Sequence, residues 1–220
     1  MERIIYEDNH LLVVNKRAGE IVQGDKTGDT PLVETMKAYI KDTCAKPGAV
    51  FLGVAHRLDR PVSGVCVFAR TSKALSRLCD MFARRDGNSV EKSYLAMVPR
   101  RDEYIGRNTR LVHWITRNER LNKSFCSDTE REGAKRAELD FDVVRTLDRY
   151  MIVEVHLHTG RHHQIRAQLS HIGLPIRGDL KYGAPRSMPD GSICLHASKV
   201  RLVHPVKREM MSFVADAPDW

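Results

Sequence analysis

The 220-residue sequence lacks the long apolar segments that a membrane-spanning protein needs. A helix that crosses a bilayer requires about 18 apolar residues in a row, and the longest apolar stretch here, residues 49–55, is only long enough for a strand. The first residues also lack the basic segment and the apolar core of a signal peptide. We therefore expect a cytoplasmic protein that has no membrane partner.

Cysteine is scarce as well, since the five cysteines are scattered, odd in number and without a C-x-x-C pair. This pattern is typical of a reduced compartment and disfavours a disulfide framework or a zinc ribbon. We expect each cysteine to be a free, buried thiol. They are Cys44, Cys66, Cys79, Cys126 and Cys194.

Three common catalytic motifs are absent: the P-loop, the glycine-rich dinucleotide fingerprint and the G-x-S-x-G elbow. Their absence disfavours phosphoryl transfer from a nucleotide, dinucleotide redox chemistry and serine hydrolysis. Four histidines are close in sequence, but the fixed charges of Arg161 and Arg166 among them oppose a bound cation. We expect no metal site and no cofactor. The four are His156, His158, His162 and His163.

What the sequence does have is an excess of positive charge, with 36 basic against 28 acidic residues and a net charge of +8. Such an excess favours polyanionic partners, although simple solubility also explains it. Residues 107–136 hold eight basic residues against four acids, which is half of the excess, together with Trp114 and Phe125. We interpret this stretch as a loop or hairpin that binds nucleic acid; the alternative is a solvated, charged hairpin.

Hydrophobic periodicity predicts both strands and helices. Thr30 is the expected N-cap of one helix, with Pro31 at the first helical position, and Thr71 or Ser72 is expected to cap another. A third helix is expected to begin near Arg161. Alternation or apolar runs predict strands at residues 4–6, 11–14, 51–54, 65–69, 137–143, 151–158 and 193–203.

Strands and helices are intermixed without regular alternation, which favours an α+β fold with a mainly antiparallel sheet. No internal repeat, low-complexity stretch or flexible linker divides the chain. We therefore expect one domain that covers residues 1–220.

Residues 56–64 form the densest polar run between two apolar strands, and catalytic groups are often held on such loops. Asp59 stands between Arg57 and Arg60, whose charges favour the ionised carboxylate. Taken alone, this short run favours a structural salt bridge that closes a turn over a catalytic role.

Several ordered motifs together resemble the RluA-like family of pseudouridine synthases along almost the whole chain. They are HRLDR-x-x-SG at 56–64, KSY-x-A-x-V at 92–98, GRHHQIR at 160–166, GD-x-x-YG at 178–183, LHA at 195–197 and HP at 204–205. The resemblance implies the catalytic fold of that family: α+β, with a mixed, mainly antiparallel sheet, flanking helices and a central active-site cleft. We expect no S4-type RNA-binding domain ahead of it.

The resemblance also implies a role for each matching residue. Asp59 matches the catalytic aspartate, and Tyr94 matches the tyrosine that packs against the target uracil. Arg166 matches the arginine that pairs with the aspartate, and Arg161 is the alternative for that pairing. The residues implied in substrate binding are Arg57, which takes the place of the flipped base, and Arg161, His163 and Leu195.

The implied activity is that of an isomerase that converts a specific uridine of structured rRNA or tRNA to pseudouridine. The aspartate acts either as nucleophile on ribose C1′ or as base at C2′. The implied reaction needs no cofactor. The sequence has no helix-turn-helix, zinc finger or basic zipper pattern, so we expect no DNA partner. We expect a monomer. Departures at Pro61, Val62, His162 and Arg17 leave the substrate open. The alternative is a non-catalytic RNA-binding or ribosome-assembly protein on the same fold.

Overall fold

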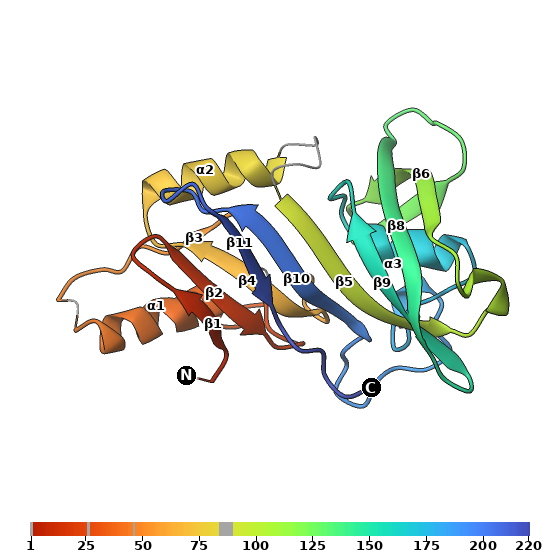
Figure 1. Ribbon diagram of the computed structural model, residues 1–220, viewed down its shortest axis with the longest axis horizontal. Coiled ribbons are helices and arrows are strands. Elements are labelled where there is room, and N and C mark those ends of the chain that lie inside the picture. Colours follow the sequence, from red (N-terminus) through yellow and green to blue (C-terminus); the bar gives the residue numbers. More distant parts are fainter. Residues whose placement is uncertain (1, 26, 46, 84–89) are drawn as a thin grey trace. The chain divides into compact units, whose positions relative to one another are not determined.

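The computed structural model describes residues 2–25, 27–45, 47–83 and 90–220 (Figure 1). The chain divides into two compact units. The first holds Met1–Val90 with Ala197–Ala217, and the second holds Glu91–His196 with Pro218–Trp220. The expected single domain over residues 1–220 stays a prediction.

The first unit is built on strands that neighbour one another in the order β1, β2, β4, β10, with β11 paired to β10 and β3 paired to β4. Strands β2 and β4 are antiparallel, with Leu11 opposite Ala69. Two helices complete the unit. The bounds are β1 Ile4–Glu7, β2 Leu11–Lys16, α1 Leu32–Thr43, β3 Gly53–Val54, β4 Ser63–Ala69, α2 Ser72–Ala83, β10 Leu195–Val203 and β11 Met210–Val214.

Strands β2 and β4 are apolar at successive positions because both of their faces are buried. Leu11 and Val13 pack in one core cluster with Leu78 of α2. Leu12 and Val14, which point to the opposite face, pack in a second cluster with residues of α1 such as Met36. The helices therefore cover opposite faces of these strands, which explains their continuous apolar sequence.

The second unit has strands in the order β5, β9, β8, β6, β7, and each strand is antiparallel to its neighbours. The predicted hairpin is confirmed: Phe141 of β8 lies opposite Val155 of β9, and both are buried. The bounds are β5 Val90–Pro99, β6 Thr109–Asn118, β7 Lys123–Ser127, β8 Lys135–Thr146, β9 Tyr150–Leu157, α3 Gln164–His171 and the short 3₁₀ turns η1 Asp102–Tyr104 and η2 Leu180–Tyr182.

Some predicted details are wrong at the ends of elements. Pro31, not Thr30, is the N-cap of α1, because its ψ of 152° keeps it extended. The expected strand over 51–54 is reduced to β3, and Phe51 is exposed. Helix α3 begins at Gln164, after a turn that places His163 in the left-handed region. Thr71 does cap α2, since its hydroxyl accepts a hydrogen bond from Ala74 N.

The cysteines are all free, as predicted, but they are not all buried. Cys44 and Cys79 are exposed and Cys126 is half-buried. Cys79 lies off the buried face of α2, which Ala74 and Leu78 form. Within the described ranges, no helix is long and apolar enough to span a bilayer.

Candidate functional site

Asp59 lies in the first unit, on the loop that joins β3 to β4. The side chain of Leu58 is buried, Arg57 is exposed, and Asp59 is half-buried. The backbone turns tightly after the acid, because Val62 N donates to Asp59 O at 3.1 Å. Gly19 N donates to the next carbonyl, that of Arg60, at 2.8 Å. Asp59 is thus carried by a backbone that is fixed at several points.

Lys16, at the end of β2, holds this loop from within the protein. Its side chain is completely buried, and its ammonium donates to backbone carbonyl oxygens. Burial lowers the pKa of Lys16 to about 8, while the carbonyl oxygens stabilise its charged form. Sequence analysis gave Lys16 no role; a lysine that ends an apolar strand was the available signal. The contacts are Val62 O at 2.6 Å, Arg17 O at 3.0 Å, Arg60 O at 3.2 Å and Asp59 O at 3.3 Å.

The two ends of the loop are also held in place. At the first end, the His56 ring stacks on Phe82 with centroids 4.4 Å apart, and its Nε2 accepts a hydrogen bond from Val67 N. At the other end, Gly64 has a φ of +115°, and a Cβ there would lie 2.3 Å from Ala197 O. Only glycine fits that position. These contacts therefore hold the backbone of the loop that carries Arg57 and Asp59 in a fixed conformation.

The second unit contains a buried ion pair that includes Arg166. Its Nε donates to Asp179 Oδ2 at 2.7 Å, and its Nη2 donates to Asp179 Oδ1 at 2.9 Å. The guanidinium also lies 5.0 Å from the centre of the Tyr182 ring. Asp179 follows Gly178, whose φ of +90° favours glycine. Sequence analysis quoted Asp179 within a motif but did not assign it a function.

Tyr182 is the centre of a group of polar and cationic side chains. Its hydroxyl accepts from Ser124 N at 2.8 Å and lies 2.9 Å from His163 Nδ1. The His163 backbone is left-handed, with a φ of 52°, which directs the ring to this hydroxyl. Lys123 Nζ lies 5.1 Å from the centre of the same ring. The structure thus brings His163 and Arg166 together around a residue that was not predicted as part of the site.

The remaining predicted residues lie on neighbouring segments of the second unit. Arg161 Nε donates to Arg136 O at 3.0 Å. Tyr94 lies in β5 opposite Val155, and its side chain is half-buried. Leu195, which begins β10, is only 3% exposed. Because Asp59 belongs to the first unit and these residues to the second, the pairing of Asp59 with Arg166 or Arg161 stays a prediction.

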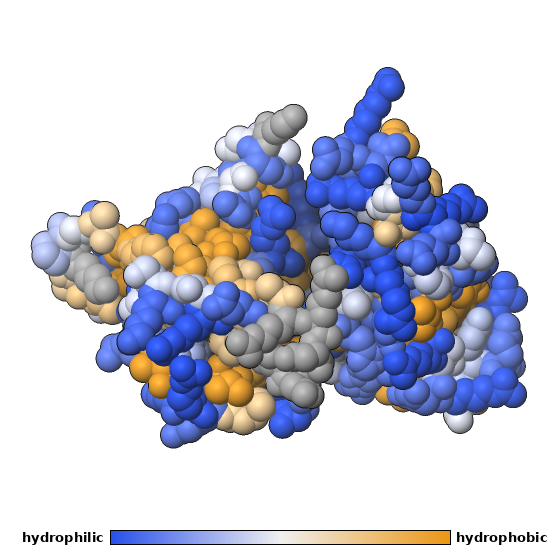
Figure 2. Space-filling model, turned by 90° about the horizontal axis from the view of Figure 1, so that it is seen from above, coloured by the Kyte–Doolittle hydropathy of each residue, from blue (hydrophilic) through white to orange (hydrophobic). Residues whose placement is uncertain are grey.

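The basic stretch forms a hairpin of β6 and β7, which was one of the two predicted forms. Arg117 and Arg120 are exposed near its tip. Phe125 and Leu121 are 46% and 56% exposed. The surface of the second unit is mainly hydrophilic in the view of Figure 2. Exposed cations beside exposed apolar side chains suit a polyanion with stacked bases.

The four clustered histidines do not gather around one point. His162 stacks on His163 with ring centroids 3.8 Å apart, His158 Nε2 contacts Asp140 Oδ2 at 2.5 Å, and His156 Nδ1 contacts Ser93 Oγ at 3.1 Å. In the part of the chain that the structure describes, three metal-ligating side chains come together only elsewhere, at His113, Asp128 and His171.

Together, the fold and the site define an α+β protein with an acid on a braced loop, an arrangement that acid–base and nucleophilic enzymes use. The sequence model of the family described as RNA pseudouridylate synthase matches residues 10–171. The chain therefore belongs to the RNA pseudouridylate synthase family. The predicted family, its enzyme class and the α+β fold with a mainly antiparallel sheet are confirmed.

Curated relatives cover nearly the whole chain. It is 31% identical to the uncharacterized RNA pseudouridine synthase YlyB of Bacillus subtilis, over 98% of the chain and 69% of that protein. It is also 31% identical to ribosomal large subunit pseudouridine synthase D of Xanthomonas campestris, over 98% of the chain and 66% of that protein. It is 30% identical to tRNA pseudouridine synthase C of Haemophilus influenzae, over 98% of the chain and 92% of that protein. The chain thus spans about two thirds of the first two relatives.

Two solved human structures have the same fold. Human RNA pseudouridylate synthase domain containing 4 superposes with a TM-score of 0.78 at 22% identity, over 99% of this chain and 89% of that one. Human RNA pseudouridylate synthase domain containing 1 superposes with a TM-score of 0.73 at 25% identity, over 98% of this chain and 83% of that one. The relatives named above include one for ribosomal RNA and one for tRNA, so their names do not select a substrate.

Proposed function

We propose that this protein isomerises a specific uridine in structured rRNA or tRNA to pseudouridine, with Asp59 as the catalytic carboxylate. The observation that carries the proposal is the braced loop of residues 56–64: the residue that matches the family's aspartate sits half-buried on a backbone held by the buried Lys16. A carboxylate fixed in this way can attack ribose C1′ or remove a proton at C2′. The base then rejoins the sugar through C5, so neither an oxidant nor an imported group is needed.

The other residues would act on the base and the RNA. The exposed Arg57 is suited to enter the base stack when the target nucleotide is flipped out, which costs a few kcal/mol. Tyr94 would hold the detached uracil by its face while the base turns. Arg166 would pair with Asp59, and Arg161, His163 and Leu195 would contact the substrate. These assignments follow from the family match and the positions described above.

We further propose that the two units act as one catalytic domain, in a cytoplasmic monomer that takes RNA and not DNA as its substrate. The net charge of +8 supports a polyanionic partner. No step of the proposed isomerisation calls for a cofactor.

Asp59→Asn tests the catalytic role, because it preserves the shape of the side chain and removes the nucleophile and base. RNA labelled with tritium at uracil C5 loses the label on isomerisation. We expect no tritium release by the variant, with the thermal midpoint nearly unchanged and RNA affinity equal or slightly higher. Release near the wild-type rate by a folded variant would exclude Asp59 as the catalytic group. No release by the wild type on total rRNA or tRNA would favour the non-catalytic RNA-binding alternative.

Tyr94 allows a second test with a matched control. Tyr94→Phe keeps the ring face and should retain RNA binding and most of the turnover, unless the hydroxyl moves the proton at C5. Tyr94→Ala removes the aromatic ring that would hold the uracil and should reduce turnover sharply. If the alanine variant releases tritium like the wild type, Tyr94 does not contact the uracil.

A further inference from the structure

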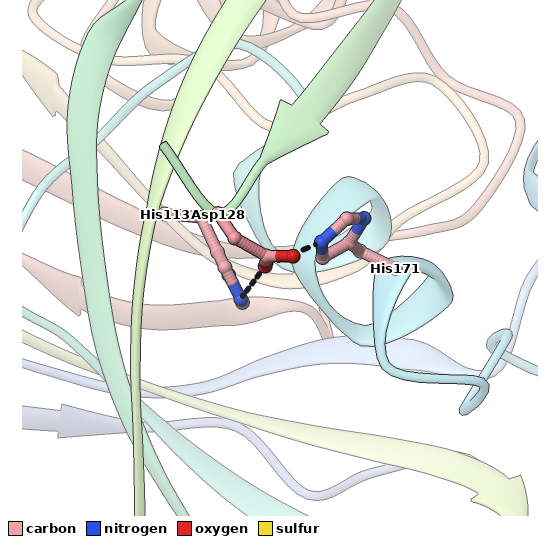
Figure 3. A group of neighbouring side chains, drawn as sticks. All are labelled: His113, Asp128 and His171. Atoms are coloured by element: carbon pink, nitrogen blue, oxygen red, sulfur yellow. Dashed lines mark hydrogen bonds and ion pairs between the residues drawn. The ribbon is translucent and has the colours of Figure 1, made fainter. Parts of the chain in front are cut away.

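Three metal-ligating side chains from three elements of the second unit converge beside one another (Figure 3). His113 comes from β6, Asp128 follows β7, and His171 is the last residue of α3. Asp128 Oδ1 lies 2.8 Å from His171 Nε2 and 3.6 Å from His113 Nε2. We propose that His113, Asp128 and His171 bind a divalent transition-metal ion of the zinc class.

The spacing of the three ligand atoms suits such an ion. They all lie within 4.8 Å of one another, and Figure 3 shows the Asp128 carboxylate between the two imidazole rings. A tetrahedral zinc ion with bonds of about 2.0–2.1 Å separates its ligand atoms by roughly 3.3 Å. Shifts of under about 1 Å would therefore bring these atoms into a coordination shell, with one position left for water or another ligand.

The backbone of the hairpin and of α3 places the three residues close together. Trp114 of β6 pairs with Ser127 of β7, which places the neighbouring residues His113 and Asp128 across from each other at the end of the ladder. Helix α3 packs on this hairpin through Ala167, in one cluster with Ile115. His171 lies one helical turn after Ala167 and so on the same face of α3. The convergence therefore follows from strand pairing and helix packing, with Asp128 as the first residue after β7.

A second feature of the site is an unpartnered oxygen behind His113. Gln168 is completely buried, and its Oε1 has no hydrogen-bond partner, while its Nε2 lies 3.0 Å from His113 Nδ1. In this arrangement His113 carries its proton on Nε2, the atom that would bind the metal. A metal-bound histidine instead donates its other N–H to an oxygen acceptor. Rotation of the Gln168 amide by half a turn would give Nδ1–H that acceptor, at the expense of the contacts of Nε2 with Ala137 O at 3.3 Å and Leu111 O at 3.5 Å.

The donor set indicates the class of ion. Two imidazole nitrogens and one carboxylate oxygen suit zinc, cobalt, nickel or copper, whereas magnesium and calcium prefer oxygen ligands only. The side chain of Asp128 is 78% exposed, so the ion can enter from solvent. Because the ligands come from β6, the end of β7 and α3, the bound ion would fasten the hairpin to the helix and stabilise the folded unit.

Untagged, chelator-treated protein titrated with Co²⁺ alone tests the proposal through the visible absorption of the ion, and equilibrium dialysis with Zn²⁺ gives the affinity. We expect one equivalent to bind to the wild type and to raise the thermal midpoint. His171→Ala and Asp128→Asn, which change accessible side chains, should weaken binding at least tenfold. Gln168→Glu, which supplies a stronger acceptor to Nδ1–H, should tighten binding about tenfold.

His158→Ala is the matched control, because it removes another accessible imidazole that contacts an aspartate, Asp140. It should leave metal binding unchanged. Wild-type protein that binds no more Co²⁺ or Zn²⁺ than His171→Ala would overturn the proposal, as would an equal loss in His158→Ala. Since the readout is metal binding and not tritium release, this result is independent of the proposed isomerisation.

Discussion

Arg166 and Asp179 form a two-point ion pair in the interior of the second unit. The Nε–Oδ2 and Nη2–Oδ1 distances are 2.7 and 2.9 Å, and the residues are only 5% and 1% exposed. A planar guanidinium bound at two points cannot rotate without breaking both hydrogen bonds. Asp179 therefore fixes the plane of Arg166, and Tyr182 limits its movement on one face. Any catalytic role of Arg166 depends on this support.

Asp179→Ala should destabilise the protein strongly, because it leaves a buried guanidinium without its counter-ion. Removal of one partner of a buried pair costs about 3–5 kcal/mol, and urea unfolding measures it. Asp179→Asn keeps one acceptor and should fold well enough for kcat to be measured, with a fall in kcat larger than the fall in folded fraction.

Glu34→Gln is the control for this pair. Glu34 and Lys37 form an exposed ion pair at 2.8 Å in α1, which should contribute less than about 0.5 kcal/mol. An Asp179→Ala protein as stable as Glu34→Gln would contradict a structural role for the buried pair.

Sequence periodicity predicted the central strands of the first unit and missed β11. β2 and β4 were found because α1 and α2 cover opposite faces of them, which requires uninterrupted apolar runs. β11 was missed because Phe213 is its only buried residue, so no alternation is visible. For β6 the sequence predicted only a loop or hairpin, because a histidine, His113, occupies one of its buried positions.

The candidate site was predicted unevenly for a related reason. Asp59 and Arg166 stand in motifs that resemble a known family, so the sequence alone was enough to single them out. The supports of these residues were not found. Lys16 reaches Val62 O across 46 positions of sequence, and its partners are backbone carbonyls that any residue would supply. Asp179 contacts Arg166 only because the turns that follow α3 return the chain to that helix. The sequence marks Lys16 at the end of an apolar strand and Asp179 within a motif, but it does not show which groups they contact.

His204 should make the protein less stable in mild acid. It is completely buried; its Nδ1 accepts hydrogen bonds from Val206 N and Lys207 N, so the proton is on Nε2, 3.1 Å from Asp8 Oδ2. Burial lowers the pKa of His204 below its ordinary 6.5, although Asp8 opposes the shift. The unfolded chain then binds the proton more readily, so stability is complete above about pH 6.5 and falls as the pH drops below it.

The thermal midpoint at pH 7.5, 6.5 and 5.5 measures this effect. His204→Asn keeps an acceptor near the two backbone N–H groups and does not titrate. We expect a lower midpoint at pH 7.5 for the variant but a smaller loss between pH 7.5 and 5.5 than for the wild type. An equal loss of thermal midpoint in both proteins between pH 7.5 and 5.5 would mean that His204 does not contribute to it. His113 is present in both proteins, so its titration cannot produce a difference between them.

The β6–β7 hairpin should carry part of the salt-dependent RNA affinity. Arg117→Ala/Arg120→Ala should weaken binding and flatten its salt dependence, by about 0.7 in log–log slope for each single-strand phosphate that the protein no longer neutralises. Lys123 is left unchanged because its ammonium also lies over the Tyr182 ring. Lys41→Ala/Lys73→Ala removes two exposed charges of the first unit as a control. An equal change of slope in both variants would assign the effect to net charge alone.

Lys16→Met should loosen the loop that carries Asp59. Methionine nearly matches the aliphatic part of lysine but removes the buried donor to Val62 O and the lysine's contacts to Asp59 O and Arg60 O. The last two oxygens keep the hydrogen bonds from Val62 N and Gly19 N. Each unsatisfied buried group costs about 1–3 kcal/mol, so we expect less stable protein and slower tritium release. Amide hydrogen exchange should become faster at Val62 N, which donates a hydrogen bond to Asp59 O within the loop. Exchange at Phe141 N, in β8 of the second unit, should not change. Lys37→Met, at a half-buried site in α1 far from the loop in sequence, should change neither tritium release nor exchange at Val62. Unaltered exchange at Val62 in Lys16→Met would show that the loop holds its shape without the ammonium.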